Sequence, residues 1–223
     1  MRKLLLIFAI ICNCALAGFK LDLGYATKVV DKGVVSIEDV AFLDTTANVK
    51  SFGGRIQLYN DVSSLKQAFS NGSFKRIDVS ADYLFTSTLA DLHLGTTYRN
   101  LHKGSQWIAA RDSVEPYIRI NGNIVKKFPW EIKGEFDLKN KTNNFEAFTQ
   151  IPFGWDKTMI LPTLGIGFND PGAPTLDVLK NAKNYYIYSL SVVQMSVIGN
   201  ISAEVYSINN NVGAVVKYTL ELK

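Results

Sequence analysis

The sequence predicts an all-β protein: a closed, antiparallel, up-and-down transmembrane β-barrel of about 12 strands. The first observation behind this prediction is the stretch 130–139 (WEIKGEFDLK), where apolar and charged residues alternate without a break. Such period-2 alternation is typical of a strand with one dry face and one wet face. The pattern recurs along the chain in segments of about ten residues, the length of a strand that crosses a bilayer at a tilt. No strong amphipathic helix is present to cover the dry faces.

The first 17 residues have the features of an export signal. Arg2 and Lys3 precede an apolar run at 4–11, and Ala-Leu-Ala at 15–17 is a cleavage motif. We therefore expect a signal peptide at 1–17 and a single barrel domain at 18–223. A lipidated Cys14 is the alternative, but Asn13 is a poor residue to precede such a site. Both cysteines lie inside this segment, so the mature chain is expected to contain no disulfide.

The composition describes a folded β protein of balanced charge. Hydrophobic residues make up 47% of the chain and aromatic residues 12%, as in packed β-structure. Removing Arg2 and Lys3 lowers the basic residues from 24 to 22 against 20 acidic ones, which leaves a formal charge of +2. Because a nucleic-acid-binding protein shows a basic patch or stripe, we expect no nucleic-acid partner.

Ten segments show the alternation clearly, 144–153 shows it less regularly, and one more is ambiguous. The clear segments are 19–29, 51–59, 74–85, 89–101, 113–121, 130–139, 158–168, 185–193, 196–208 and 212–223. Three long connections are predicted at 30–50, 100–112 and 169–183, although residues 34–43 also fit an extension of a strand. Asn121-Gly122 predicts a tight hairpin turn.

The ambiguous segment 62–69 fits a helical turn as well as a weak strand. Outer-membrane barrels have long loops at one end, short turns at the other and an even number of strands. Counting 62–69 as a strand satisfies both conditions, because all three long connections then follow strands of one direction. Twelve strands are therefore predicted, and ten strands with a helical connection is the alternative.

Alternation alone does not separate a membrane barrel from a soluble lipocalin-like barrel or sandwich with its apolar face inside. Three features favour a barrel surrounded by lipid. They are the long dry faces, the absence of cysteine from the mature chain and a final strand that reaches the last residue. Aromatic residues also gather at strand ends, as in the girdles at membrane interfaces. They are Phe19, Phe52, Tyr59, Phe74, Trp130, Phe153, Phe168, Tyr185 and Tyr206.

In this pattern, over nearly the whole mature chain, the sequence resembles small single-chain bacterial outer-membrane β-barrel proteins. The resemblance implies a monomer in the cell outer membrane, in contact with outer-membrane lipid and inserted by the outer-membrane assembly machinery. Members of this class typically end in an aromatic residue that the machinery recognises. Here Tyr218, Leu220 and Leu222 keep the alternation, but Lys223 is the terminal residue.

The polar faces of the strands supply the candidate site. In a barrel these side chains line the lumen, where opposite charges either pair and fill the interior or border a narrow pore. The candidate lumen residues are Arg55, Arg76, Asp78, Asp82, Asp91, His93, Arg99, Arg119, Glu131, Lys133, Glu135, Asp137, Glu204 and Lys217.

No motif for catalysis, a metal or a cofactor is found. His93 and His102 have no second ligand at metal-binding spacing. Gly165-Ile-Gly167 is only a fragment of a dinucleotide-binding motif, without the third glycine and the helix. We therefore predict no catalytic residue, no metal and no cofactor.

Three functional hypotheses follow. The favoured one is an outer-membrane barrel of structural or narrow-channel type with outer loops at 30–50, 100–112 and 169–183. The alternative is a soluble exported (periplasmic or secreted) β-barrel that binds a small apolar ligand. A lipid-modifying barrel enzyme is the third, although no G-x-S-x-G motif occurs.

Overall fold

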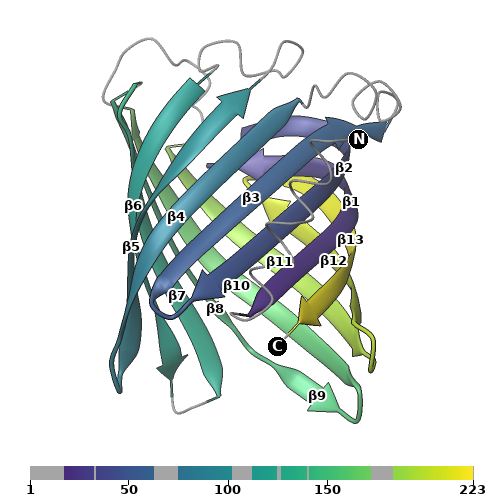
Figure 1. The fold of residues 1–223 in the computed structure, drawn as a ribbon. Coiled ribbons are helices and arrows are strands. Elements are labelled where there is room, and N and C mark those ends of the chain that lie inside the picture. The colour runs from purple at the N-terminus through teal and green to yellow at the C-terminus, as the bar shows by residue number, and fades with distance from the viewer. Residues whose placement is uncertain are drawn as a thin grey trace, which may run out of the picture.

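The protein is a closed antiparallel barrel of twelve strands (Figure 1). The computed structural model describes residues 18–32, 34–62, 75–101, 112–124, 127–139, 141–171 and 183–222. The strand segments are β1 (Phe19–Asp31), β2 (Val34–Val49), β3 (Phe52–Asp61), β4 (Arg76–Thr86), β5 (Ala90–Leu101), β6 (Asp112–Ile124), β7 (Phe128–Asp137), β8 (Thr142–Gln150), β9 (Phe153–Trp155), β10 (Thr158–Pro171), β11 (Asn184–Met195), β12 (Asn200–Ile208) and β13 (Asn211–Leu222).

The strands pair in chain order, and β13 pairs with β1 to close the barrel. The closing register runs from Phe19 opposite Leu222 to Ala26 opposite Val215. The short β9 does not add a separate strand to the barrel wall, because β8 and β9 both pair with β10. The thirteen strand segments therefore form a wall of twelve strands, which confirms the predicted fold class and the even number of strands.

The strand ends that the longest connections join all lie at one end of the barrel. Residues 62–75 join β3 to β4, 102–111 join β5 to β6, and 172–183 join β10 to β11. The opposite end has short links, such as 50–51 and 156–157. Because membrane barrels carry their long loops outside the cell, we name these the outer end and the inner end.

The predicted long connection at 30–50 is wrong, since most of it is β2. Two irregularities hide this strand in the sequence. The register of β1 with β2 shifts between Val29 and Val30, and Asp39 has a positive φ of 48°. Each irregularity breaks the apolar–polar alternation. β2 supplies the twelfth strand, whereas the predicted strand 62–69 lies, apart from Val62, outside the described residues.

The predicted turn at Asn121-Gly122 is also wrong. β6 continues to Ile124, and Gly122 lies opposite Trp130 of β7. A Cβ atom at Gly122 would lie 3.1 Å from Cζ2 of Trp130. This glycine therefore makes room for a cross-strand aromatic ring and does not mark a turn.

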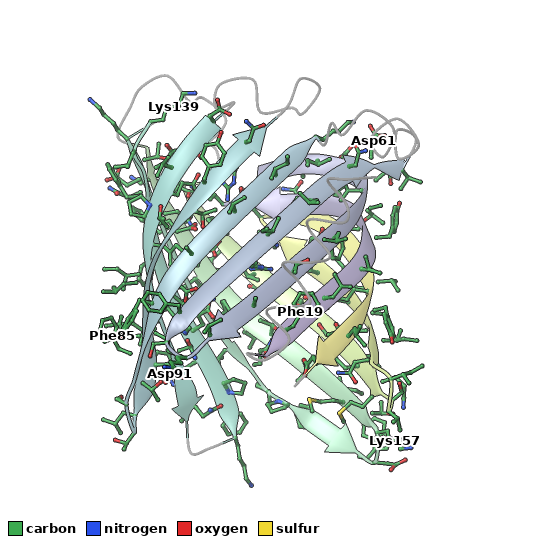
Figure 2. The ribbon with its side chains drawn as sticks, in the orientation of Figure 1. Phe19, Asp61, Phe85, Asp91, Lys139 and Lys157 are labelled. Carbon is green, nitrogen blue, oxygen red and sulfur yellow. The ribbon has the colours of Figure 1, made fainter. Side chains whose placement is uncertain are left out.

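The barrel has a polar interior and an apolar outer surface. Among the described residues, nineteen polar or charged residues are buried but only seven hydrophobic ones. Large apolar side chains instead lie on the outside, for example Ile166 and Leu190, which are 55% and 50% exposed. Figure 2 shows Phe85 pointing away from the barrel. A soluble barrel buries its apolar face, so this inverted distribution fits a barrel surrounded by lipid.

In the part of the chain that the structure describes, no helix has the length and apolar character needed to cross a membrane.

Candidate functional site: the barrel lumen

The lumen contains a cavity of about 750 Å³ whose lining comes from strands around most of the barrel. Eleven of the fourteen candidate lumen residues line it. They are Arg55, Arg76, Asp78, Asp82, His93, Arg99, Arg119, Lys133, Glu135, Glu204 and Lys217. The alternation places them there because every second side chain of a barrel strand points inward.

The other three candidates lie elsewhere. Glu131 lines a second cavity, of about 360 Å³, near the inner β6–β7 turn, together with His93 and Arg119. Asp137 is buried at the outer end of β7, where its Oδ1 accepts a hydrogen bond of 2.9 Å from the Lys139 amide. Asp91 lies at the inner end, next to the β4–β5 turn (Figure 2).

At the outer end of the lumen, six charged residues form one network, here called the outer network. It comprises Asp31, Lys32, Arg76, Asp78, Arg99 and Glu115. Asp31 Oδ2 lies 3.2 Å from Arg76 Nη1 and 2.8 Å from Arg99 Nη1. Three cations balance three anions, so the network has no formal net charge. Buried charges of this kind are tolerated only when they are paired in this way.

The remaining pairs of the outer network tie it to three wall strands. Arg76 Nη2 contacts Asp78 Oδ2 at 2.6 Å, and Arg99 Nη1 contacts Glu115 Oε1 at 3.2 Å. Ser113 donates a hydrogen bond of 2.8 Å to the same Glu115 oxygen. The guanidinium of Arg76 also lies 5.3 Å from the centre of the Tyr59 ring, a cation–π distance. Both arginines are consequently held in fixed positions.

Two members of the outer network belong to the end of the β1–β2 hairpin, which enters the lumen. Lys32 is only 5% exposed, and its Nζ lies 3.3 Å from Glu115 Oε2 of β6. Its carbonyl oxygen accepts a hydrogen bond of 2.7 Å from Asn169 Nδ2 of β10. Figure 1 shows the purple end of this hairpin turned across the outer end of the barrel. The hairpin thus contacts the wall at two widely separated strands.

An apolar cluster supports the hairpin from within. Ala26, Ile37 and Val40 are buried, and Phe42 and Tyr59 pack against them. Ser36, also buried, donates a hydrogen bond of 3.0 Å to the carbonyl oxygen of Val29. These contacts hold the base of the hairpin where it leaves the wall.

Closer to the inner end, the charged groups form smaller clusters. Asp22 lies between two lysines, with Lys20 Nζ at 3.4 Å and Lys217 Nζ at 3.5 Å. Asp44 accepts several hydrogen bonds from Arg55, including one of 2.9 Å from Nε. Each carboxylate is thus neutralised by a cation on a neighbouring strand.

His93 belongs to a third cluster, with Asp82 and Arg119. Its Nδ1 lies 2.5 Å from Asp82 Oδ2 and 2.9 Å from Arg119 Nη2. Within the described ranges, no three His, Cys, Asp or Glu side chains are arranged to hold a metal ion. His102 lies outside the described residues.

Inward-facing aromatic rings lie against glycines of the adjacent strand. Four direct cross-strand pairs share this arrangement. They are Gly24–Phe42, Gly95–Tyr117, Gly167–Tyr185 and Gly213–Tyr206. In each pair, a Cβ atom on the glycine would meet the aromatic side chain at less than a normal contact distance. The rings therefore occupy space that a side chain would fill and leave the centre of the lumen free.

Sequence reasoning missed several charged lumen residues. Glu115 has the same parity as Arg119 on β6, so alternation alone identifies it. Asp22 is likewise in phase with Lys20 on β1. Asp31 and Lys32 carry no such signal, because they follow the register shift in a segment predicted to be a loop.

The closed twelve-stranded barrel, with its apolar exterior and charged lumen, has the fold of small outer-membrane channel porins. Two solved porins are similar in structure. The KdgM porin aligns with a TM-score of 0.60 at 9% identity over 92% of this chain and 98% of that one. The NanC porin aligns with a TM-score of 0.56 at 8% identity over 92% and 99%.

A second KdgM structure, in complex with disordered oligogalacturonate, aligns with a TM-score of 0.58 at 9% identity over 92% of this chain and 98% of that one. No protein-family pattern and no curated protein matches this chain in sequence. At such low identity the likeness concerns the fold, and the structural neighbours are channels, not enzymes.

Proposed function

We propose that the protein is a monomeric diffusion channel of the bacterial outer membrane that passes small polar solutes. The observation that carries this proposal is the cavity of about 750 Å³, which is lined mainly by charged and polar side chains. A barrel that served only as a structural element would have no need to keep such a space. The glycine–aromatic pairs preserve this space, since they keep bulky rings against the wall.

The lining predicts weak selectivity for the sign of a solute's charge. Eight basic and seven acidic residues border the cavity, and most of them are paired. Strong selectivity is usually produced by a ring of one sign. Although one KdgM structure is described as a complex with oligogalacturonate, the near-neutral lining of this lumen gives no strong preference for an anionic saccharide.

The soluble alternative receives no support from this lumen. A carrier of small apolar ligands needs a cavity lined mainly by hydrophobic side chains, whereas charged and polar side chains together make up most of the lining here. The enzyme hypothesis likewise has no arrangement of side chains in its favour. The proposed partners are therefore membrane lipid and, during biogenesis, the outer-membrane assembly machinery.

The proposal is tested with the refolded mature chain. Folding is verified first by a gel shift between unheated and boiled samples, as folded membrane barrels migrate differently from unfolded ones. Planar-bilayer recordings should then show unitary currents, with a reversal potential near zero in a salt gradient. A neutral and an anionic oligosaccharide of equal size should enter liposomes at similar rates. Folded protein that gives no unitary currents in the bilayer would contradict the proposed channel function.

Location requires a separate experiment. Fractionation of cells that express the full chain should recover the protein with the outer membrane, and extraction should need detergent. Recovery of a detergent-free monomer from the soluble fraction would instead support the soluble exported barrel.

A further inference from the structure

The β1–β2 hairpin extends beyond the wall of the barrel. β1 pairs with β13 only as far as Ala26, and β2 pairs with β3 only from Val40 onward. Between these positions the two strands pair only with each other, up to Asp31 opposite Val34. The segment 27–39 is therefore a separate two-stranded element. We call it the inner hairpin because it lies inside the lumen, although it is at the outer end of the barrel.

Several features direct the inner hairpin into the lumen. The register shift at Val29–Val30 bends the ribbon, as bulges do. Lys32 and Asp39 have positive φ values of 52° and 48°, which sharpen the turn and bend β2. Tyr206 donates a hydrogen bond to the carbonyl oxygen of Lys28, and Thr27 Oγ1 accepts one of 2.9 Å from the Ala214 amide. These contacts fix the hairpin where it leaves the wall.

The tip contacts the lumen wall through polar interactions. Asp31 pairs with arginines of β4 and β5, while Lys32 pairs with Glu115 of β6 and its carbonyl accepts from Asn169 of β10. The tip therefore spans the outer end of the lumen from one side of the barrel to the other. Its lysine side chain is 4% exposed, so little solvent passes at this point.

We infer that the tip of the inner hairpin, Asp31 and Lys32, sets the smallest aperture of the channel and so determines which solutes pass. The inference rests on the proposed channel function. The cavity below the tip is wide enough to hold a small solute, whereas Lys32 and its partners Glu115 and Asn169 are buried and the Asp31 side chain is only 16% exposed. Resistance to flow is therefore concentrated where the hairpin crosses the lumen.

The tip is held differently from its base, which makes the inference testable without unfolding the barrel. Apolar packing of Ile37 and Val40 holds the base, while ion pairs and hydrogen bonds hold the tip. Removing the ammonium group of Lys32 breaks its pair with Glu115 and leaves the wall pairing unchanged. Asparagine suits this position, because it tolerates a positive φ.

The first experiment compares Lys32→Asn with a matched control, Lys141→Asn. Lys141 is also a lysine with positive φ, 53°, in a turn at the outer end, but it is exposed and makes no ion pair with any described residue. Single-channel conductance should rise several-fold in Lys32→Asn relative to both the wild type and Lys141→Asn.

A second variant removes the tip entirely. Val29 and Ile37 lie opposite each other, so replacing residues 30–36 with Asn-Gly joins them by a two-residue hairpin turn. This variant should conduct at least as well as Lys32→Asn. In Lys32→Asn, the uncompensated Glu115 could bind another cation that fills the gap. The deletion variant covers this case, because without the tip the gap is too wide for one cation to close.

A chemical readout accompanies the currents. Ser189 lines the cavity, so a Ser189→Cys background places a thiol below the tip. A membrane-impermeant thiol reagent added on the outer side of whole cells should label this cysteine faster in the two hairpin variants than in the Lys141→Asn control. The parent without the added cysteine supplies the background.

The outcomes separate the inference from the function on which it rests. Equal, measurable conductance and equal labelling in all variants would overturn the role of the tip and leave the channel intact. Folded barrels that neither conduct nor admit the reagent in any variant would overturn both. Higher conductance and faster labelling in the hairpin variants alone would support both.

Discussion

At the scale of the residue, the glycines opposite inward aromatic rings determine how the lumen is filled. Tyr185 shows the principle, since its ring covers Gly167 and its hydroxyl oxygen lies 2.9 Å from Asn144 Oδ1 and 2.5 Å from Glu146 Oε1, two acceptors for its single proton. A ring held flat against the wall in this way uses its hydroxyl to satisfy buried polar groups. The glycine–tyrosine pair therefore leaves the centre of the lumen open and also fixes the position of the ring.

We expect Gly167→Ala to destabilise the barrel by about 1–3 kcal/mol, the usual cost of overpacking a filled site. The added Cβ atom would overlap the Tyr185 ring and displace its hydroxyl from Asn144 and Glu146. Denaturant unfolding, followed by the gel shift in lipid vesicles, measures the effect. Gly134→Ala is the control, because its Cβ atom would meet nothing within 4 Å. Equal stability of the two variants would refute this role of the glycine.

A second residue-scale prediction concerns Glu115, whose side chain is 1% exposed and which balances Lys32 and Arg99. Glu115→Gln removes the charge but keeps the shape, so two buried cations lose a partner. Breaking a buried pair in this way typically costs about 3–5 kcal/mol. The same unfolding measurement should show this loss for Glu115→Gln. It should show little change for Glu131→Gln, which is half-buried and makes no ion pair with a described residue.

At the scale of the element, strands with unbroken alternation were predictable from sequence. The predicted strand 130–139 corresponds to β7, which begins and ends two residues earlier. It was predictable because each charged residue of β7 has an apolar or glycine neighbour on either side. β2 was missed for a physical reason. Its register shift and its positive φ at Asp39 exchange the inward and outward faces within one strand. A pattern that assumes a constant period of two cannot follow such a change.

The two faces of β11 offer a direct test of which side contacts lipid. Leu190 lies on the outer surface near the middle of the strand, and its neighbour Ser189 lines the lumen cavity. A lysine in lipid at mid-membrane costs about 2–4 kcal/mol. Leu190→Lys should therefore lose about that much stability in vesicles, whereas Ser189→Lys should lose less. A larger loss for Ser189→Lys would indicate that the apolar surface does not contact lipid.

At the scale of the whole molecule, the sequence predicted a closed barrel of twelve strands but not the crossing of its lumen. The predicted number of twelve counted 62–69 as a strand and 30–50 as a long connection, whereas the structure has β2 at Val34–Val49, so the total agrees although one of its strands differs. The contact of Asn169 with the carbonyl of Lys32 joins residues 137 positions apart, and it exists only after the barrel has closed. Its partners are brought together by the bend of one hairpin, which has no periodic signal in the sequence. The paired wall charges were therefore predictable, and the outer network as a whole was not.

Closure itself gives the last prediction. β13 pairs with β12 on one side and with β1 on the other, so removing residues 211–223 leaves two open edges in a sheet that must satisfy its backbone hydrogen bonds in lipid. Each unsatisfied backbone group in the bilayer costs several kcal/mol, so this truncated chain should not fold in vesicles and its gel shift should vanish.

The matched control is deletion of Lys223 alone, because β13 ends at Leu222. This variant should refold in vesicles as well as the full chain, since every register pair of β13 with β1 and β12 remains. In cells, the same deletion removes the charge of Lys223 and makes the apolar Leu222 the last residue, whereas the terminal residue that the assembly machinery typically recognises is aromatic. Comparison of its outer-membrane yield with that of the full chain would then show whether Lys223 limits assembly, separately from its effect on folding. A truncated chain that still gave the gel shift without β13 would mean that this strand does not close the barrel.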